Sequence, residues 1–162
     1  MTVSTFSGEV QDEQDLGVCY ERRELVRIRL AEKIELRRKL IKAFRFNVAG
    51  LKKMHGLLTS QPPIIPDYRL DTESVSHILF HGRNLFDDEG WFDKFNWQRF
   101  QLVHINAQVD FLNEIHNLSD ISPRSIFPQG GLFHRRYASL VKNLQIIQEE
   151  ILQTIAEYER VA

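Results

Sequence analysis

The first third of the chain carries a long, regular pattern of apolar positions. Between residues 30 and 58 these positions follow one another at steps of four and three, and they are Leu30, Ile34, Ile41, Phe44, Val48, Leu51 and Leu58, with Arg37 and His55 as the two polar exceptions. A mean step of about 3.5 residues is the period of a coiled coil. The pattern therefore predicts a long, coiled-coil-like helix that begins near Gln14 or Val18 and ends at Leu58.

This helix is too long for a compact protein of this size. From Arg22 to Leu58 it would measure about 55 Å at 1.5 Å per residue. A globule of 162 residues is only about 40 Å across. Gly50 lies inside the helix, where glycine costs about 1 kcal/mol relative to alanine. We therefore expect the helix either to break near residues 47–50 or to project from the body, and a projecting apolar seam needs a partner.

The rest of the pattern predicts three further helices. Residues 59–71 form a proline-rich connector, because prolines at three of five positions cannot continue a helix. A short helix follows over residues 73–86, with Gly82 as an alternative end. Two long amphipathic helices then cover residues 91–117 and 132–161, with Thr154 as the one polar member of the last seam and a loop over residues 117–131 between them. No segment alternates with a period of two, so the predicted fold class is all-α: an elongated helical bundle with three long amphipathic helices and one short helix.

Composition supports one soluble domain. The chain has 162 residues, of which 43% are hydrophobic and 27% charged, as in ordinary globular proteins. Residues 1–15 are polar and acidic, so we expect a disordered tail there, followed by a single helical-bundle domain over 16–162: the long basic helix 16–58, the connector 59–71 and the remaining helices within 72–161. The lone Cys19 and the lack of a membrane-length apolar run predict a cytoplasmic protein with no membrane insertion.

Charge is distributed unevenly along the chain. Residues 21–53 contain 12 Lys/Arg and 4 Asp/Glu, although the whole chain has a net charge of −1. A basic helix of this kind can contact nucleic acid, and the candidate residues for that contact are Arg37, Arg38, Lys39, Lys42 and Arg45. Alternatively, the helix is solvated and paired with the protein's own acidic segments at residues 67–93 and 149–159. The pI of about 6.6 is lower than in dedicated nucleic-acid-binding domains.

The favoured interpretation is a protein that acts by binding. The sequence contains no constellation of catalytic residues, and the first helix has a seam longer than the rest of the fold can cover. We therefore expect a non-enzymatic helical interaction module or a self-associating subunit of an assembly, with another protein or a second copy as partner and without a cofactor. The predicted interface residues are Ile34, Ile41, Phe44, Val48, Leu51, Trp91 and Trp97.

One short pattern suggests an alternative, enzymatic function. Arg99 and His104 are separated by four residues, and this spacing resembles the signature of the HEPN ribonuclease superfamily, whose members are all-α bundles. The resemblance implies RNA cleavage by an Arg and a His that lie close together at a dimer interface. The sequence departs from the family at Phe100, where a polar residue is usual. Positions five apart differ by about 140° around a helix, so the two side chains do not naturally share a face. We therefore predict no ribonuclease activity.

A second short pattern concerns metal binding. Glu73, His77 and His81 are spaced at four-residue intervals and would line one face of the short helix. Two histidines at this spacing can bind zinc, with a carboxylate as a third ligand. The order of the three residues matches no known zinc or di-iron motif. A polar, solvated helix face explains them equally, so the sequence predicts no metal site.

Overall fold

The computed structural model describes residues 4–86, 90–118 and 134–161. Within these ranges the chain forms α1 (Ser4–Leu58), α2 (Thr72–His81), a 3-10 turn η1 (Arg83–Leu85), α3 (Trp91–Leu118) and α5 (His134–Arg160), and no strand. The predicted all-α fold is thus confirmed. Most of the predicted loop over residues 117–131 lies outside the described residues.

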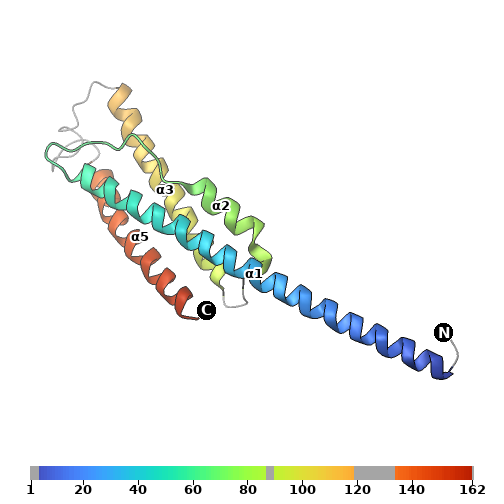
Figure 1. Ribbon diagram of the computed structural model, residues 1–162. Coiled ribbons are helices and arrows are strands. Elements are labelled where there is room, and N and C mark those ends of the chain that lie inside the picture. The colour runs from blue at the N-terminus through green and yellow to red at the C-terminus, as the bar shows by residue number, and fades with distance from the viewer. Residues whose placement is uncertain (1–3, 87–89, 119–133, 162) are drawn as a thin grey trace.

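The helices pack around one apolar core. α1 contacts α5 along one side and α2 along the other, while α3 contacts both α2 and α5 (Figure 1). Each helix contributes the apolar residues of its seam, and the largest fully buried side chains include Phe44 of α1, Phe95 and Leu102 of α3 and Leu140 of α5. Thr154 is the polar exception in the last seam. Its hydroxyl oxygen accepts a hydrogen bond at 2.7 Å from the side-chain amide of Gln98 on α3.

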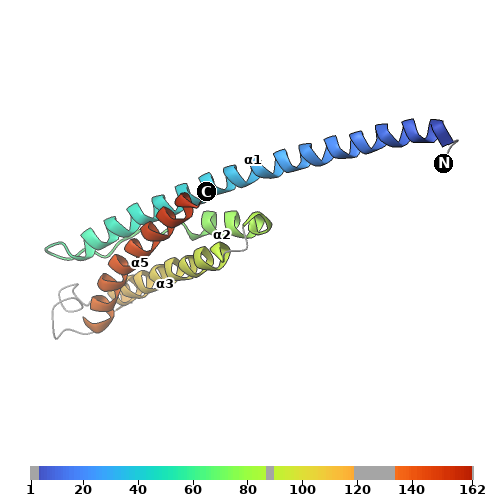
Figure 2. The same ribbon diagram turned by 90° about the horizontal axis from the view of Figure 1, so that it is seen from below.

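α1 is one continuous helix that projects far beyond the bundle. It has 55 residues, which gives a length of about 82 Å at 1.5 Å per residue. Figure 2 shows α1 continuing alone past the ends of the other helices. Of the two alternatives derived from the sequence, projection is therefore the one observed. The helix begins at Ser4 and so includes most of residues 1–15, which we predicted as a disordered tail; no proline interrupts this stretch. The division into tail and domain stays a prediction.

Gly50 does not break α1, and its role is to make room for the connector. A Cβ added at Gly50 would lie only 2.9 Å from the Cδ2 atom of Leu70. The hydroxyl of Tyr68 donates a hydrogen bond to the carbonyl oxygen of Gly50 at 2.9 Å. The glycine thus lets the connector approach the helix backbone closely.

Two asparagine side chains hold the end of the connector between α1 and α3. Asn47 of α1 is buried, and its amide exchanges two hydrogen bonds with the backbone of Asp71, at 2.8 Å and 3.0 Å. Asn106 of α3 does the same with the backbone of Leu70, at 2.8 Å and 3.0 Å. The side chain of Asp71 in turn accepts a hydrogen bond from the backbone N–H of Ser74 and caps α2.

α2 ends at His81, with Gly82 as its C-cap, so the helix has the earlier of the two ends that the sequence offered and does not continue to Phe86. The backbone N–H of Gly82 donates the last hydrogen bond of the helix to the carbonyl oxygen of Ile78, and a Cβ at Gly82 would overlap the side chain of Leu36. With glycine at this position, the Leu36 side chain of α1 packs directly against the end of α2. The chain continues as the short turn η1. α3 and α5 end within one residue of the predicted positions.

Replacing Asn47 by alanine should destabilise the protein strongly. The substitution leaves the partly buried N–H and C=O groups of Asp71 without their side-chain partners, which costs about 2–4 kcal/mol of unfolding free energy. Chemical denaturation followed by circular dichroism measures this loss. The matched control is Asn117→Ala at the exposed end of α3, which should change the unfolding free energy by less than about 0.5 kcal/mol. Equal stabilities of the two variants would contradict the role assigned to Asn47.

Candidate functional site

The projecting part of α1 exposes an unusual number of large aliphatic side chains. Leu25, Val26, Ile28, Leu30 and Ile34 lie within ten residues of one another and are 47–68% exposed. We call this stretch the projecting segment (residues 21–35); among the described helices, α2 approaches it at a groove lined by Ile28, Glu35 and His81. Single exposed aliphatic residues are common on proteins, whereas a cluster of this kind makes the segment a candidate interaction surface.

The aliphatic residues of the projecting segment fall on two faces of the helix. Val26, Leu30 and Ile34 follow one another at four-residue steps and continue the seam that is buried farther along α1 at Ile41 and Phe44. Leu25 and Ile28 lie on the opposite side, where Ile28 lines the groove between α1 and α2. α5 covers the first face only as far as its C-terminal end, where Tyr158 contacts Arg37. On the first face, no described helix follows α5 beyond that point.

Five of the seven predicted interface residues belong to the bundle's own core. Ile41, Phe44, Val48, Leu51 and Trp91 are all buried within the chain. A partner cannot reach them while the bundle is folded. The other two are exposed, Ile34 on the projecting segment and Trp97 on α3. The sequence analysis missed Leu25, Val26 and Ile28, although their position ahead of the bundle was a usable signal.

The predicted nucleic-acid residues are partly engaged by the protein itself. Arg45 forms an ion pair with Glu159 of α5 at 2.9 Å, and Arg38 forms one with Glu35 at 2.8 Å. The hydrogen bond from Arg38 lowers the pKa of the Glu35 carboxyl. Arg37 lies over the ring of Tyr158, 4.9 Å from its centroid. Lys39 and Lys42 are exposed.

Charge along α1 changes in three steps. By sequence, residues 1–20 hold four Asp/Glu and no Lys/Arg. The projecting segment holds four Glu and five Lys/Arg, so its charges nearly cancel. Residues 36–58 hold seven Lys/Arg and no Asp/Glu. The helix is therefore acidic at its start, mixed in the middle and basic where it joins the bundle.

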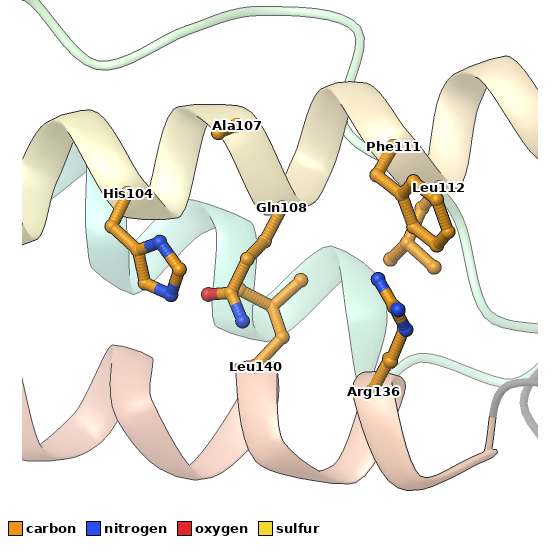
Figure 3. Close-up of a pocket in the computed structure, with 7 residues that line it drawn as sticks. All are labelled: His104, Ala107, Gln108, Phe111, Leu112, Arg136 and Leu140. Carbon is orange, nitrogen blue, oxygen red and sulfur yellow. The ribbon is translucent and has the colours of Figure 1, made fainter.

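Arg99 and His104 point to different neighbours. The Arg99 guanidinium donates hydrogen bonds to the side chains of Asn96, at 3.0 Å, and of Ser76 on α2, at 3.4 Å. It also lies between the rings of Phe80 and Phe100. His104 instead faces α5 (Figure 3). The helix thus directs the two side chains toward opposite flanks, as their spacing predicted, and they do not form a pair in the chain.

His104 lines a small groove between α3 and α5. The groove has a volume of about 290 Å³, and its lining is mostly apolar and includes Ala107, Phe111, Leu112 and Leu140. Figure 3 shows His104 and Gln108 reaching from α3, and Arg136 from α5, into the space between the helices. The Arg136 guanidinium lies over the Phe111 ring, 4.4 Å from its centroid. Arg136 is thus stacked on an aromatic ring, and the residues that line the groove include no Ser, Thr, Cys or Lys that could act as a nucleophile.

The proposed metal ligands are only partly brought together. The rings of His77 and His81 lie 4.1 Å apart, and both residues line a groove between α1 and α2 that also contains Glu32 and Glu35. Glu73 is exposed and does not line this groove. Among the described residues, no three His, Cys, Asp or Glu side chains are placed to hold a metal ion together.

Comparison with known proteins gives no assignment. The chain matches no protein-family model, no curated protein and no solved structure. None of the described helices is both long enough and apolar enough to span a bilayer.

We expect no RNA cleavage by the purified protein. Arg99 is held toward α2 and His104 faces α5, so the two groups cannot act on one phosphodiester within the chain. Incubation with labelled single-stranded RNA in the presence of a chelator measures the activity. Metal-independent cleavage that disappears in His104→Ala, with the helical circular dichroism spectrum unchanged, would contradict this expectation.

Proposed function

We propose that the protein is a non-enzymatic, self-associating helical module, and that two copies pair through the projecting segment of α1. The observation that carries the proposal is the cluster of five aliphatic side chains, 47–68% exposed, on a helix that leaves the bundle. Removing such side chains from water is the main driving force of helix association. The bundle then serves as the folded body from which the pairing helix extends.

A second copy of the chain is the partner that the charges favour. The projecting segment carries four Glu and five Lys/Arg, so two such segments can lie together without strong repulsion. A partner of strongly acidic or basic character would gain little from this balance. A coiled-coil period that continues into the segment at Leu30 and Ile34 supplies the matching shape.

Nucleic-acid binding by the basic part of α1 is the second candidate. It is favoured by the seven Lys/Arg and the absence of Asp/Glu over residues 36–58. Against it, Arg37, Arg38 and Arg45 already contact Tyr158, Glu35 and Glu159. Binding of labelled RNA that falls steeply with salt, and that is lost when Lys39 and Lys42 are changed to Gln, would favour this candidate.

Light scattering should give the mass of a dimer, near 38 kDa, which is twice the chain mass of 19.1 kDa. The double variant Ile28→Asp with Leu30→Asp should reduce the mass to that of one chain, because it places two carboxylates in the centre of the paired segments. Its bundle should remain folded, since neither residue is in the core.

The matched control changes two equally exposed aliphatic residues of α5, Ile146→Asp with Leu152→Asp. This variant should keep the dimer mass. A single-chain mass for the wild-type protein at tens of micromolar, where a Kd of about 1 μM would give mostly dimer, would overturn the proposal.

A further inference from the structure

Three polar side chains with unused hydrogen-bonding capacity meet at the groove between α3 and α5. The Arg136 guanidinium lies over the Phe111 ring, and none of the described residues accepts a hydrogen bond from it. The Oε1 atom of Gln108 is buried and has no hydrogen-bond partner. His104 is exposed and forms no hydrogen bond within the described part of the chain. Figure 3 shows Gln108 between the other two. A buried acceptor without a partner is uncommon in proteins and indicates a group that is still to be bound.

The geometry of α3 sets the distances along the groove. His104, Gln108 and Phe111 follow one another at steps of four and three, so they lie on the same side of the helix. Measured along the axis from Phe111, Gln108 is about 4.5 Å away and His104 about 10.5 Å, at 1.5 Å per residue. Arg136 and Leu140 share a side of α5 because they are four residues apart. The groove therefore has a guanidinium at one end, an imidazole at the other and an amide between them.

The surface between these polar groups is apolar. Leu112 and Leu140 are buried beneath the groove, and Ala107 lies beside it. Arg136 and His104 are the ionisable residues of the lining, which includes no Asp or Glu. The volume of about 290 Å³ is close to the lower end of the range for small-molecule sites. These properties fit a small ligand that has an apolar body and a negative charge at one end.

We propose that this groove binds a small organic acid, with its carboxylate on Arg136 and its apolar body against Leu112 and Leu140. A guanidinium that is stacked on a ring keeps its N–H groups in its own plane, so it can still donate two parallel hydrogen bonds to a carboxylate. Binding here goes beyond the proposed self-association and does not depend on it, because the lining residues belong to α3 and α5 and not to α1.

Gln108 makes the groove selective for an acid that also carries a hydroxyl or N–H group. The terminal torsion of glutamine has a broad preference, so the amide can turn its buried oxygen toward the groove. The oxygen then accepts a hydrogen bond from a donor that lies about one helical turn from the carboxylate. An acid without such a donor leaves the oxygen unpaired and therefore binds more weakly.

The lining favours a carboxylate over a phosphate group. Arg136 is the one permanently charged residue among the seven that line the groove, and its planar fork matches the two oxygens of a carboxylate. A phosphate ester would place more charge, and the polar groups of a nucleotide, against the apolar surface over Leu112 and Leu140. A monocarboxylate places only its head at Arg136 and leaves its apolar body in the middle of the groove.

The site is tested by nuclear magnetic resonance titration of the full-length, ¹⁵N-labelled protein with 4-hydroxyphenylacetate, an aromatic acid with a hydroxyl group. Saturable shifts should appear at the backbone amides of Ala107 and Phe111, with a Kd below about 1 mM, as expected for a ligand of this size. 4-Hydroxyphenylacetamide, which lacks the charge, should bind at least about ten-fold more weakly. Phenylacetate, which lacks the hydroxyl, should bind at least about five-fold more weakly.

Two neighbouring arginines provide a matched pair of variants. Arg136→Gln should raise the Kd of 4-hydroxyphenylacetate at least about ten-fold, because it removes the carboxylate's partner. Arg135→Gln makes the same change in net charge at an exposed position of α5 that does not line the groove, and it should leave the Kd unchanged. Circular dichroism checks that both variants keep their helices.

Each outcome supports or overturns a stated part of the proposal. The absence of saturable shifts with 4-hydroxyphenylacetate at about 10 mM would overturn the site, and so would shifts confined to residues outside the groove. Equal weakening by Arg136→Gln and Arg135→Gln would show a general attraction to the basic start of α5 and would also overturn it. Equal affinity for the two acids would overturn the role of Gln108. If Arg136→Gln does not fold, the comparison of the acid with its amide on the unchanged protein decides the role of the charge.

Discussion

The placement of the helices depends on how the backbone of Leu70 and Asp71 is held. An asparagine side chain offers one acceptor and one donor at the spacing of a peptide group, so it can satisfy both polar groups of one residue. Asn47 does this for Asp71 from α1, and Asn106 does it for Leu70 from α3. The connector is thus tied to two helices at adjacent residues. Because Asp71 also caps α2, the start of α2 is fixed by the same contacts.

The periodicity of the sequence predicted the helices well, since each long helix buries one continuous apolar stripe. It could not predict which polar or small residues inside the stripes were structural. Asn47 and Gly50 were interpreted as a point of weakness in α1, whereas they are the points at which the connector docks. Their partners are 18–24 residues away along the chain. Thr154 is a similar case, because its partner Gln98 lies on another helix. Contacts of this kind depend on the packing and have no local pattern.

The exposed aliphatic cluster that we propose as an interaction surface was only partly predictable, for a different reason. A single seam runs along α1, and its period is the same where α5 covers it and where nothing does. Ile34 and Ile41 are therefore equivalent in the sequence, yet one is exposed and the other buried. What separates them is the position at which α5 ends, beside Arg37 and Arg45. The angular argument for Arg99 and His104 needed only the geometry of one helix, which is why it agreed with the structure.

Because α1 is continuous, it fixes both the distance and the direction of the exposed aliphatic cluster relative to the bundle. Core residues and exposed residues belong to one unbroken helix, so the direction in which Ile28 points is set by the burial of Phe44 and Leu51 sixteen or more residues away. One residue inserted between them would advance the projecting segment by about 1.5 Å and turn it by about 100° relative to the bundle. Seven inserted residues would turn it by only about 20° while moving it by about 10 Å. The number of residues between the bundle and the exposed cluster thus sets how far the cluster lies from the bundle and in which direction its side chains point.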